Sequence, residues 1–143
     1  MSDISRRKFL EGAAAVGCGA LVLGGCAQGG PIDGTITPTN NMATLTFAMY
    51  PKLVTVGGGV VVDGGNGPIA VIRTGDTTAT ALSAVCTHQS CTVEIQSGSP
   101  PLFCPCHGSE FAISGVVVRG PARQSLRVYQ ASVDMNGVTV MLA

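Results

Sequence analysis

Residues 86–111 read CTHQSCTVEIQSGSPPLFCPCHGSEF, and the rest of the chain is organised around them. The stretch holds both histidines of the protein and four of its six cysteines, although only 11% of all residues are charged and 4% are aromatic. Thiolates and imidazoles are the ligands that zinc and iron centres select. The concentration of these side chains therefore predicts a metal site.

The spacing of the ligands separates two kinds of metal site. Cys86 and His88 form C-x-H, and Cys104 and His107 form C-x-x-H. Such a set suits one zinc ion, or a 2Fe-2S cluster in which two histidines replace two cysteines on one iron. One residue between Cys86 and His88 is tight for a single tetrahedral ion. The same spacing fits without strain if each loop provides its two ligands to different irons. The spacing therefore favours the cluster.

The motif C-T-H-Q-S-C followed by C-P-C-H-G-S resembles the cluster-binding signature of the Rieske proteins of cytochrome bc-type complexes and their relatives. The resemblance implies a Rieske-type 2Fe-2S cluster, with Cys86 and Cys104 on one iron and His88 and His107 on the other. It also implies an all-β fold, in which two cluster loops form a small subdomain at the tip of an antiparallel sandwich or barrel.

The resemblance further implies the surroundings of the cluster. Cys91 and Cys106 match the pair that the family joins by a disulfide between the two loops. Gly108 and Ser109 are retained, and the family's serine donates its hydroxyl hydrogen to a cluster sulfide. Pro121 falls where the family has a proline-bearing loop that covers the cluster from a third side.

Two departures from the bc-type pattern lie in the same loops. Gln89 and Ser90 stand where bc-type proteins usually have leucine and glycine, and that leucine packs at the quinol site. Phe111 stands where high-potential members have a tyrosine that donates to a cysteine sulfur. The first departure leaves quinol docking open, and the second predicts a lower reduction potential.

The composition excludes several other classes of function. The formal net charge is zero and there is no basic patch in the sequence, so nucleic acid is not an expected partner. No histidine remains for the second, mononuclear iron of a Rieske oxygenase. The C-P-C-H at 104–107 is one residue short of the haem-attachment motif C-x-x-C-H. We expect an electron carrier without a catalytic site of its own.

Three functions fit these features. The first is a Rieske subunit of a quinol-oxidising respiratory complex with cytochrome b- or c-type partners. The second is the electron-transfer subunit of another exported oxidoreductase, such as an arsenite-oxidase-like enzyme with a molybdenum subunit, or a free-standing Rieske protein. The third is a zinc-binding, disulfide-stapled module without redox activity.

The N-terminus resembles a twin-arginine export signal, with Arg6 and Arg7 in S-R-R-x-F-L before the uncharged run 12–25. This run is shorter than the roughly 20 residues of a membrane-spanning helix. It ends in L-G-G-C, which resembles a lipobox with Cys26 as the acylated residue. Ordinary cleavage and a retained signal anchor are the alternatives. Each of these routes predicts an exported protein, and the lipid or the anchor would tether it to the membrane on its periplasmic or extracytoplasmic side.

These features divide the chain into residues 1–26 as the signal, 27–42 as a flexible linker and 43–143 as the Rieske domain. The linker is rich in turn formers and has no hydrophobic period. In bc-type Rieske proteins a similar link lets the head move between two partners.

The domain itself shows strand and turn patterns only. The turn signals are Gly64-Gly65-Asn66-Gly67 and Asn136-Gly137, the second of which predicts a hairpin. The predicted strands are 44–48, 59–62, 69–73, 80–85, 116–119, 125–129, 131–134 and 138–142. Short strands at this spacing favour an antiparallel sandwich or barrel.

Overall fold

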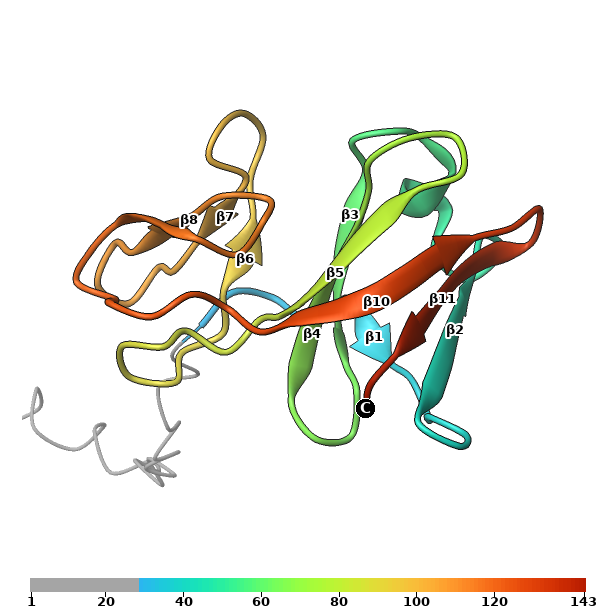
Figure 1. Cartoon of the computed structure of the whole chain (residues 1–143), viewed down its shortest axis with the longest axis horizontal. Helices are drawn as coiled ribbons and strands as arrows, with labels where there is room; N and C mark the ends of the chain where they lie inside the picture. Colours follow the sequence, from blue (N-terminus) through green and yellow to red (C-terminus); the bar gives the residue numbers. More distant parts are fainter. Residues whose placement is uncertain (1–28) are drawn as a thin grey trace, which may run out of the picture.

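The structure is a computed structural model that describes residues 29–143 (Figure 1). Over this range the chain is almost entirely β, as the sequence predicts, with one short 3-10 helix, η1 (Pro51–Val54). No helix among the described residues is long and apolar enough to cross a membrane. The twin-arginine pair and Cys26 lie outside the described residues.

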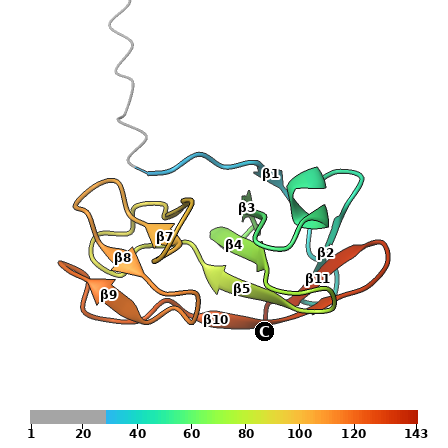
Figure 2. The same cartoon turned by 90° about the horizontal axis from the view of Figure 1, so that it is seen from above.

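A seven-stranded sheet forms the base of the molecule, in the order β1-β3-β4-β5-β10-β11-β2. Adjacent strands of this sheet pair antiparallel, except that β1 pairs with β3 in parallel. The sheet curls, so that η1 contacts strands from both of its halves, namely β3 and β11 (Figures 1 and 2). Its strands are β1 (Gly34–Thr35), β2 (Met42–Thr46), β3 (Gly59–Asp63), β4 (Pro68–Arg73), β5 (Ala79–Ser83), β10 (Val128–Val133) and β11 (Gly137–Met141).

A second, four-stranded antiparallel sheet lies beside one end of the base, in the order β6-β7-β8-β9 (Figure 2). Its strands are β6 (Glu94–Ile95), β7 (Leu102–Phe103), β8 (Glu110–Phe111) and β9 (Val117–Arg119). Only β9 overlaps a predicted strand. The other three have two residues each, and so short a segment shows no period from which a strand can be predicted.

The central strands of the base explain how the two sheets hold together. In β4, four consecutive residues are buried, Ile69 to Ile72. Successive side chains of a strand point to opposite faces. Ile69 and Val71 therefore face the core inside the curled base, while Ala70 and Ile72 join the core shared with the small sheet. Burial on both faces is the reason why β3 and β4 read as continuous apolar runs rather than alternating ones.

Both predicted turns are confirmed. Gly64 donates its N–H to the Gly67 carbonyl at 3.0 Å and closes the β3–β4 hairpin. In the β10–β11 hairpin, Asp134 Oδ1 accepts hydrogen bonds from the Asn136 and Gly137 N–H groups at 2.7 and 3.0 Å. The two strands predicted at 125–129 and 131–134 are a single strand, β10, because Gln130 pairs with β11 and continues the ladder.

The prediction of a flexible linker over 27–42 is wrong for residues 29–36, which are bonded to the rest of the fold, and for Met42, which begins β2. Gly34 and Thr35 form β1 on the edge of β3, and Ile36 is buried in the base core. The folded unit therefore begins before residue 43. Strand addition satisfies backbone groups regardless of side chains, so a segment of glycine, threonine and proline showed no pattern that predicts it.

Residues 29–36 also connect the two sheets. Gly30 donates its N–H to the Thr92 carbonyl at 2.9 Å, next to the small sheet. Further along, Asp33 Oδ2 accepts the Val61 N–H of β3 at 2.9 Å, while its Oδ1 accepts from Lys52 Nζ at 2.6 Å. We call residues 29–36 the strap, because they are bonded to both parts of the molecule.

Candidate metal centre

The first half of the predicted site is loop 1, residues 86–91, which follows β5. Its ends are joined by the Cys86 N–H, which donates to the Cys91 carbonyl at 2.8 Å. Inside the loop the Ser90 N–H donates to the Cys86 carbonyl at 2.9 Å. Ser90 has φ 59°, a left-handed conformation that costs a residue other than glycine roughly 1–2 kcal/mol.

Loop 2, residues 104–109 between β7 and β8, repeats this arrangement. The Cys104 N–H donates to the Ser109 carbonyl at 2.8 Å, and the Gly108 N–H donates to the Cys104 carbonyl at 2.9 Å. Gly108 has φ 77°, at the position equivalent to Ser90. Two loops of equal length with the same backbone bonds thus face each other, and each carries its free cysteine at the first position.

The four predicted ligands divide into a buried pair and an exposed pair. Cys86 and Cys104 are free thiols that are only 2% and 1% exposed. Burial raises the pKa of the Cys104 thiol, and its hydrogen bond with the Cys86 thiol raises it further. His88 and His107 are exposed, and their ring centroids lie 4.9 Å apart in an edge-to-face arrangement. The fold thus brings together Cys86 and Cys104, which are 18 positions apart in the sequence, and His88 and His107, which are 19 apart.

The two remaining cysteines of the loops, Cys91 and Cys106, form a disulfide. The pairing is the one that the family resemblance implies, and it ties loop 1 to loop 2. Their sulfurs and that of Cys104 lie within 4.8 Å of one another. A bonded sulfur has no thiolate to offer a metal, so of these three only Cys104 remains available as a ligand.

A third segment, residues 120–124, is bonded to both loops, and we call it the proline loop. The Ala122 N–H donates to Ser109 Oγ at 3.0 Å, and both residues are buried. Thr87 Oγ1 donates to the Gln124 carbonyl at 2.6 Å. Because Ser109 Oγ accepts from Ala122, its own hydrogen stays free for another acceptor. The spacing of the motif did not point to Thr87, since its partner lies 37 residues away.

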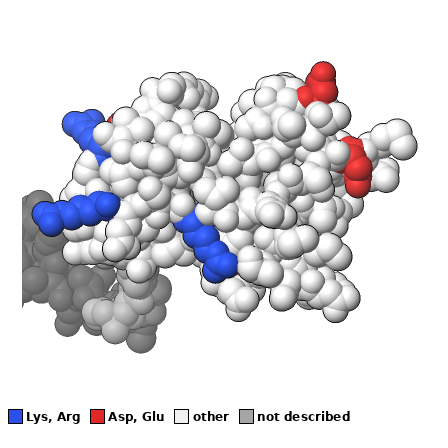
Figure 3. Space-filling model, viewed as in Figure 1, with Lys and Arg blue, Asp and Glu red and all other residues white. Residues whose placement is uncertain are grey.

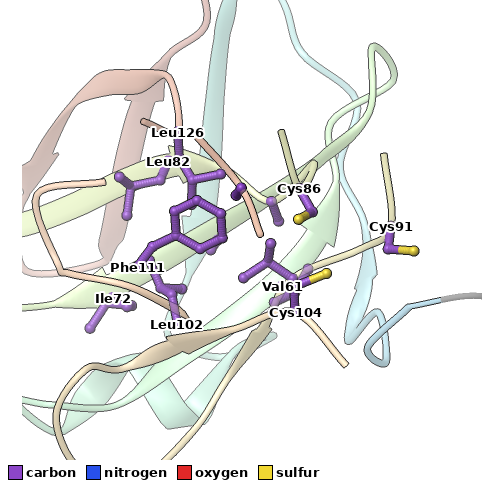
Figure 4. Packing of buried hydrophobic residues seen from close by; sticks show 13 residues of the cluster. Val61, Ile72, Leu82, Cys86, Cys91, Leu102, Cys104, Phe111 and Leu126 are labelled. Carbon is purple, nitrogen blue, oxygen red and sulfur yellow. The ribbon is translucent and has the colours of Figure 1, made fainter. Parts of the chain in front are cut away.

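Phe111 lies in the hydrophobic core beneath the site. Its side chain is 0% exposed and belongs to the same buried cluster as Cys86 and Cys104. Figure 4 shows the ring packed close to Leu82, Leu102 and Leu126, with the two cysteines on the same side of the cluster. Phe111 therefore belongs to the same hydrophobic core as the two free cysteines of the site.

The donor set fits an iron-sulfur cluster with mixed ligands. Two buried thiols lie beside each other at the core, and two imidazoles lie beside each other at the surface. Thiols must lose their protons to bind a metal. Burial raises the pKa of the Cys104 thiol, and a bound metal ion would stabilise its thiolate form.

The comparison with known protein families decides what kind of site this is. Residues 47–130 match the family described as the Rieske [2Fe-2S] domain. The chain belongs to this family. Its cofactor is a Rieske-type 2Fe-2S cluster, and the alternative of a structural zinc site is set aside.

Several relatives are similar to this Rieske protein. The cytochrome b6-f complex iron-sulfur subunit of Synechococcus sp. (strain JA-3-3Ab) is 46% identical over 68 residues, which are 48% of this chain and 40% of that protein. The same subunit of Prochlorococcus marinus (strain MIT 9515) is 46% identical over 66 residues, or 46% and 37% of the two chains. The alignments thus span well under half of the length of these curated relatives.

Solved structures confirm the Rieske fold. The cyanobacterial plasma membrane Rieske protein PetC3 from Synechocystis PCC 6803 is 33% identical with a TM-score of 0.55, over 66% of this chain and 93% of that chain. The ferredoxin of carbazole 1,9a-dioxygenase from Nocardioides aromaticivorans IC177 is 23% identical with a TM-score of 0.56, over 70% and 95% of the chains. This second likeness concerns the fold alone.

Proposed function

We propose that this Rieske protein is a one-electron carrier in which Cys86 and Cys104 hold one iron and His88 and His107 hold the other. The observation that carries the proposal is that two buried thiols and two exposed imidazoles lie in the same two loops, at one end of the molecule. The bound cluster supplies a one-electron couple at a potential of roughly −150 to +300 mV.

The protein's own residues make this end suitable for electron exchange. The two thiols lie in the apolar core and exclude water from one side of the site. The two imidazoles reach solvent, so a partner protein can approach them directly. The disulfide and the proline loop hold the two cluster loops in place.

Metal and sulfide analysis tests the ligand assignment. Protein purified with its cofactor should contain two irons and two acid-labile sulfides per chain and show a Rieske-type visible spectrum. His107→Ala should abolish that spectrum, whereas Gln89→Ala, an exposed change in loop 1, should leave it intact. One zinc ion without iron or sulfide in the unmodified protein would refute the assignment.

For the biological setting, we propose a subunit of a quinol-oxidising, cytochrome bc-like complex. The support is the likeness to cytochrome b6-f iron-sulfur subunits, which reaches 46% identity over 68 residues. Membranes solubilised in mild detergent should then yield this protein together with a b-type cytochrome, and a quinol analogue should reduce its cluster.

Two observations favour a second candidate, a carrier that serves another exported oxidoreductase or works free-standing. Gln89 replaces the leucine that packs at the quinol site in bc-type proteins. The strap is bonded to β3 and to the segment that leads into β6, so residues 29–36 do not provide the link on which a head could move. Co-purification with a molybdenum subunit, or with no cytochrome b, would select this candidate.

We further propose export by the twin-arginine route and a membrane tether through Cys26. Changing Arg6 and Arg7 to lysine should retain the precursor in the cytoplasm. Cys26→Ser should release the mature protein from the membrane fraction. If the Cys26 variant is processed and fractionates like the parent, simple cleavage or a retained anchor replaces the lipid.

A further inference from the structure

The charges of the described residues are separated along the molecule, although the whole chain is neutral. Among residues 29–143, the small sheet, its loops and the segment that leads into β10 carry three arginines against two glutamates. The base carries two basic residues against four aspartates. Of the three arginines, Arg127 lies where the two parts meet, because its carbonyl accepts the Ser83 N–H of β5 at 2.8 Å and its guanidinium lies over Tyr129 of β10. Figure 3 shows basic side chains on the side of the small sheet and at the centre, and acidic ones at the opposite end. The described part of the protein is therefore an electric dipole, with its negative end at the far end of the base and its positive charge toward the metal site and the junction of the two sheets.

The three arginines, which we call the basic rim, are Arg119, Arg123 and Arg127, and all are exposed. Arg123 is the most informative, because it lies inside the proline loop between Ala122 and Gln124. Each of these two neighbours is hydrogen-bonded to a cluster loop, at 3.0 and 2.6 Å. The backbone of Arg123 is thus held directly beside the metal site.

The rim keeps most of its charge available. Arg119 lies 3.5 Å from Glu110, and its side chain remains 72% exposed. Within residues 29–143, no carboxylate lies within 4.0 Å of the Arg123 or Arg127 guanidinium. Arg127 stacks over the Tyr129 ring at 5.2 Å, which orders its side chain without neutralising it. Guanidinium groups bind carboxylates with two parallel hydrogen bonds and are favoured in protein interfaces.

The geometry points to the basic rim as the docking surface for a redox protein whose own electron-transfer site is surrounded by acidic side chains. This inference rests on the proposed function, because the exposed imidazoles of His88 and His107 are the place where the electron would leave. On docking, one electron passes from the reduced protein to the partner's acceptor, and no bond is made or broken. Since the net charge is near zero, the dipole rather than the total charge would orient the encounter.

The experiment uses two forms of one acceptor, horse cytochrome c in its native basic form and after succinylation of its lysines, which makes it acidic. The cluster-loaded full-length protein is reduced and mixed with each form in a stopped-flow instrument. At an ionic strength of about 0.01 M the Debye length is about 30 Å, and at 0.1 M it is about 10 Å. We expect the acidic form to react faster at low salt, by about threefold or more, and this advantage to disappear as salt is added.

Single-charge variants show whether the rim is responsible. Arg123→Gln should reduce the advantage of the acidic cytochrome. Lys52→Gln is the matched control, because it removes one positive charge from the base and breaks only an exposed ion pair. Because Lys52 lies on the base, its loss should reduce the advantage far less than Arg123→Gln does.

Three outcomes would overturn the inference alone. The first is equal, salt-independent rates with both cytochromes, which would leave the proposed carrier function intact. The second is a faster reaction with the basic form. The third is salt-sensitive binding to vesicles containing 30% phosphatidylglycerol that Arg123→Gln abolishes, because the rim would then face a membrane. If loaded protein reduces neither cytochrome, the proposed function itself fails and the inference fails with it.

Discussion

Replacing Ser109 by alanine removes a hydroxyl that serves two neighbours at once. Its oxygen accepts the Ala122 N–H at 3.0 Å, in a region where Ser109 is 0% and Ala122 only 5% exposed. Its hydrogen stays available for the metal site. We therefore expect the variant to loosen the proline loop and to remove a hydrogen-bond donor from the cluster.

The two effects have separate magnitudes. A buried N–H left without an acceptor costs about 1–3 kcal/mol. For a domain of this size 1 kcal/mol corresponds to roughly 4 °C in Tm. A donor that strengthens as the cluster gains negative charge raises the potential. For a one-electron couple about 1.4 kcal/mol equals about 59 mV. We therefore expect Ser109→Ala to lower Tm by several degrees and the potential by several tens of millivolts.

The assay combines thermal unfolding of the cofactor-loaded protein with voltammetry at a fixed pH. Thr87→Ala is the matched control, because it releases the other bond of the proline loop, the one to the Gln124 carbonyl. That bond is exposed, and its loss leaves the Ser109 hydroxyl in place. The control should lower Tm by less and barely change the potential.

An unchanged Tm in Ser109→Ala would refute the view that this hydroxyl anchors the proline loop. An equal fall in potential in both variants would show that loop position, and not the serine hydroxyl, controls the potential. The expected result is a larger fall in both Tm and potential in Ser109→Ala than in Thr87→Ala.

Three further predictions concern the same end of the molecule. Phe111→Tyr places a hydroxyl in a fully buried site, and voltammetry should show a potential raised by several tens of millivolts; an unchanged or lower value would mean that no cysteine sulfur accepts the new hydrogen bond. Changing Cys91 and Cys106 together to serine should permit cluster assembly but shorten the half-life of the visible spectrum on warming, because the loops lose their covalent link; an equal half-life would contradict this. Ser90→Gly should raise Tm by a few degrees, since φ 59° costs glycine nothing; a lower Tm would show that the serine side chain contributes more than its strain costs.

The two loops that carry the cysteines and histidines were predictable from the sequence because their determinants are local. Each cluster loop has six residues and is closed by hydrogen bonds between its own ends. The residue types at these positions therefore report directly on the chemistry. The same holds for hairpins such as Gly64–Gly67, whose turn residues and flanking apolar runs are adjacent in the chain.

Other features of the site depend on segments that are distant in sequence. The bond from Ala122 to Ser109 and the bond from Thr87 to Gln124 bridge 13 and 37 positions. Neither has a pattern in the residues around it. The position of Arg123 beside the cluster loops follows from these two bonds, so the separation of charge was invisible in a chain whose net charge is zero.

The sequence by itself determined the strand-rich base and the family, and it supplied the proposed ligand set, because these depend on residue identity and on spacing over a few positions. The tertiary structure alone decided that the thiols are buried while the imidazoles face solvent, since burial depends on which core packs beneath the loops. It also decided that residues 29–36 are a strap and not a linker. A strand added through backbone hydrogen bonds to the edge of β3 leaves no trace in the side chains.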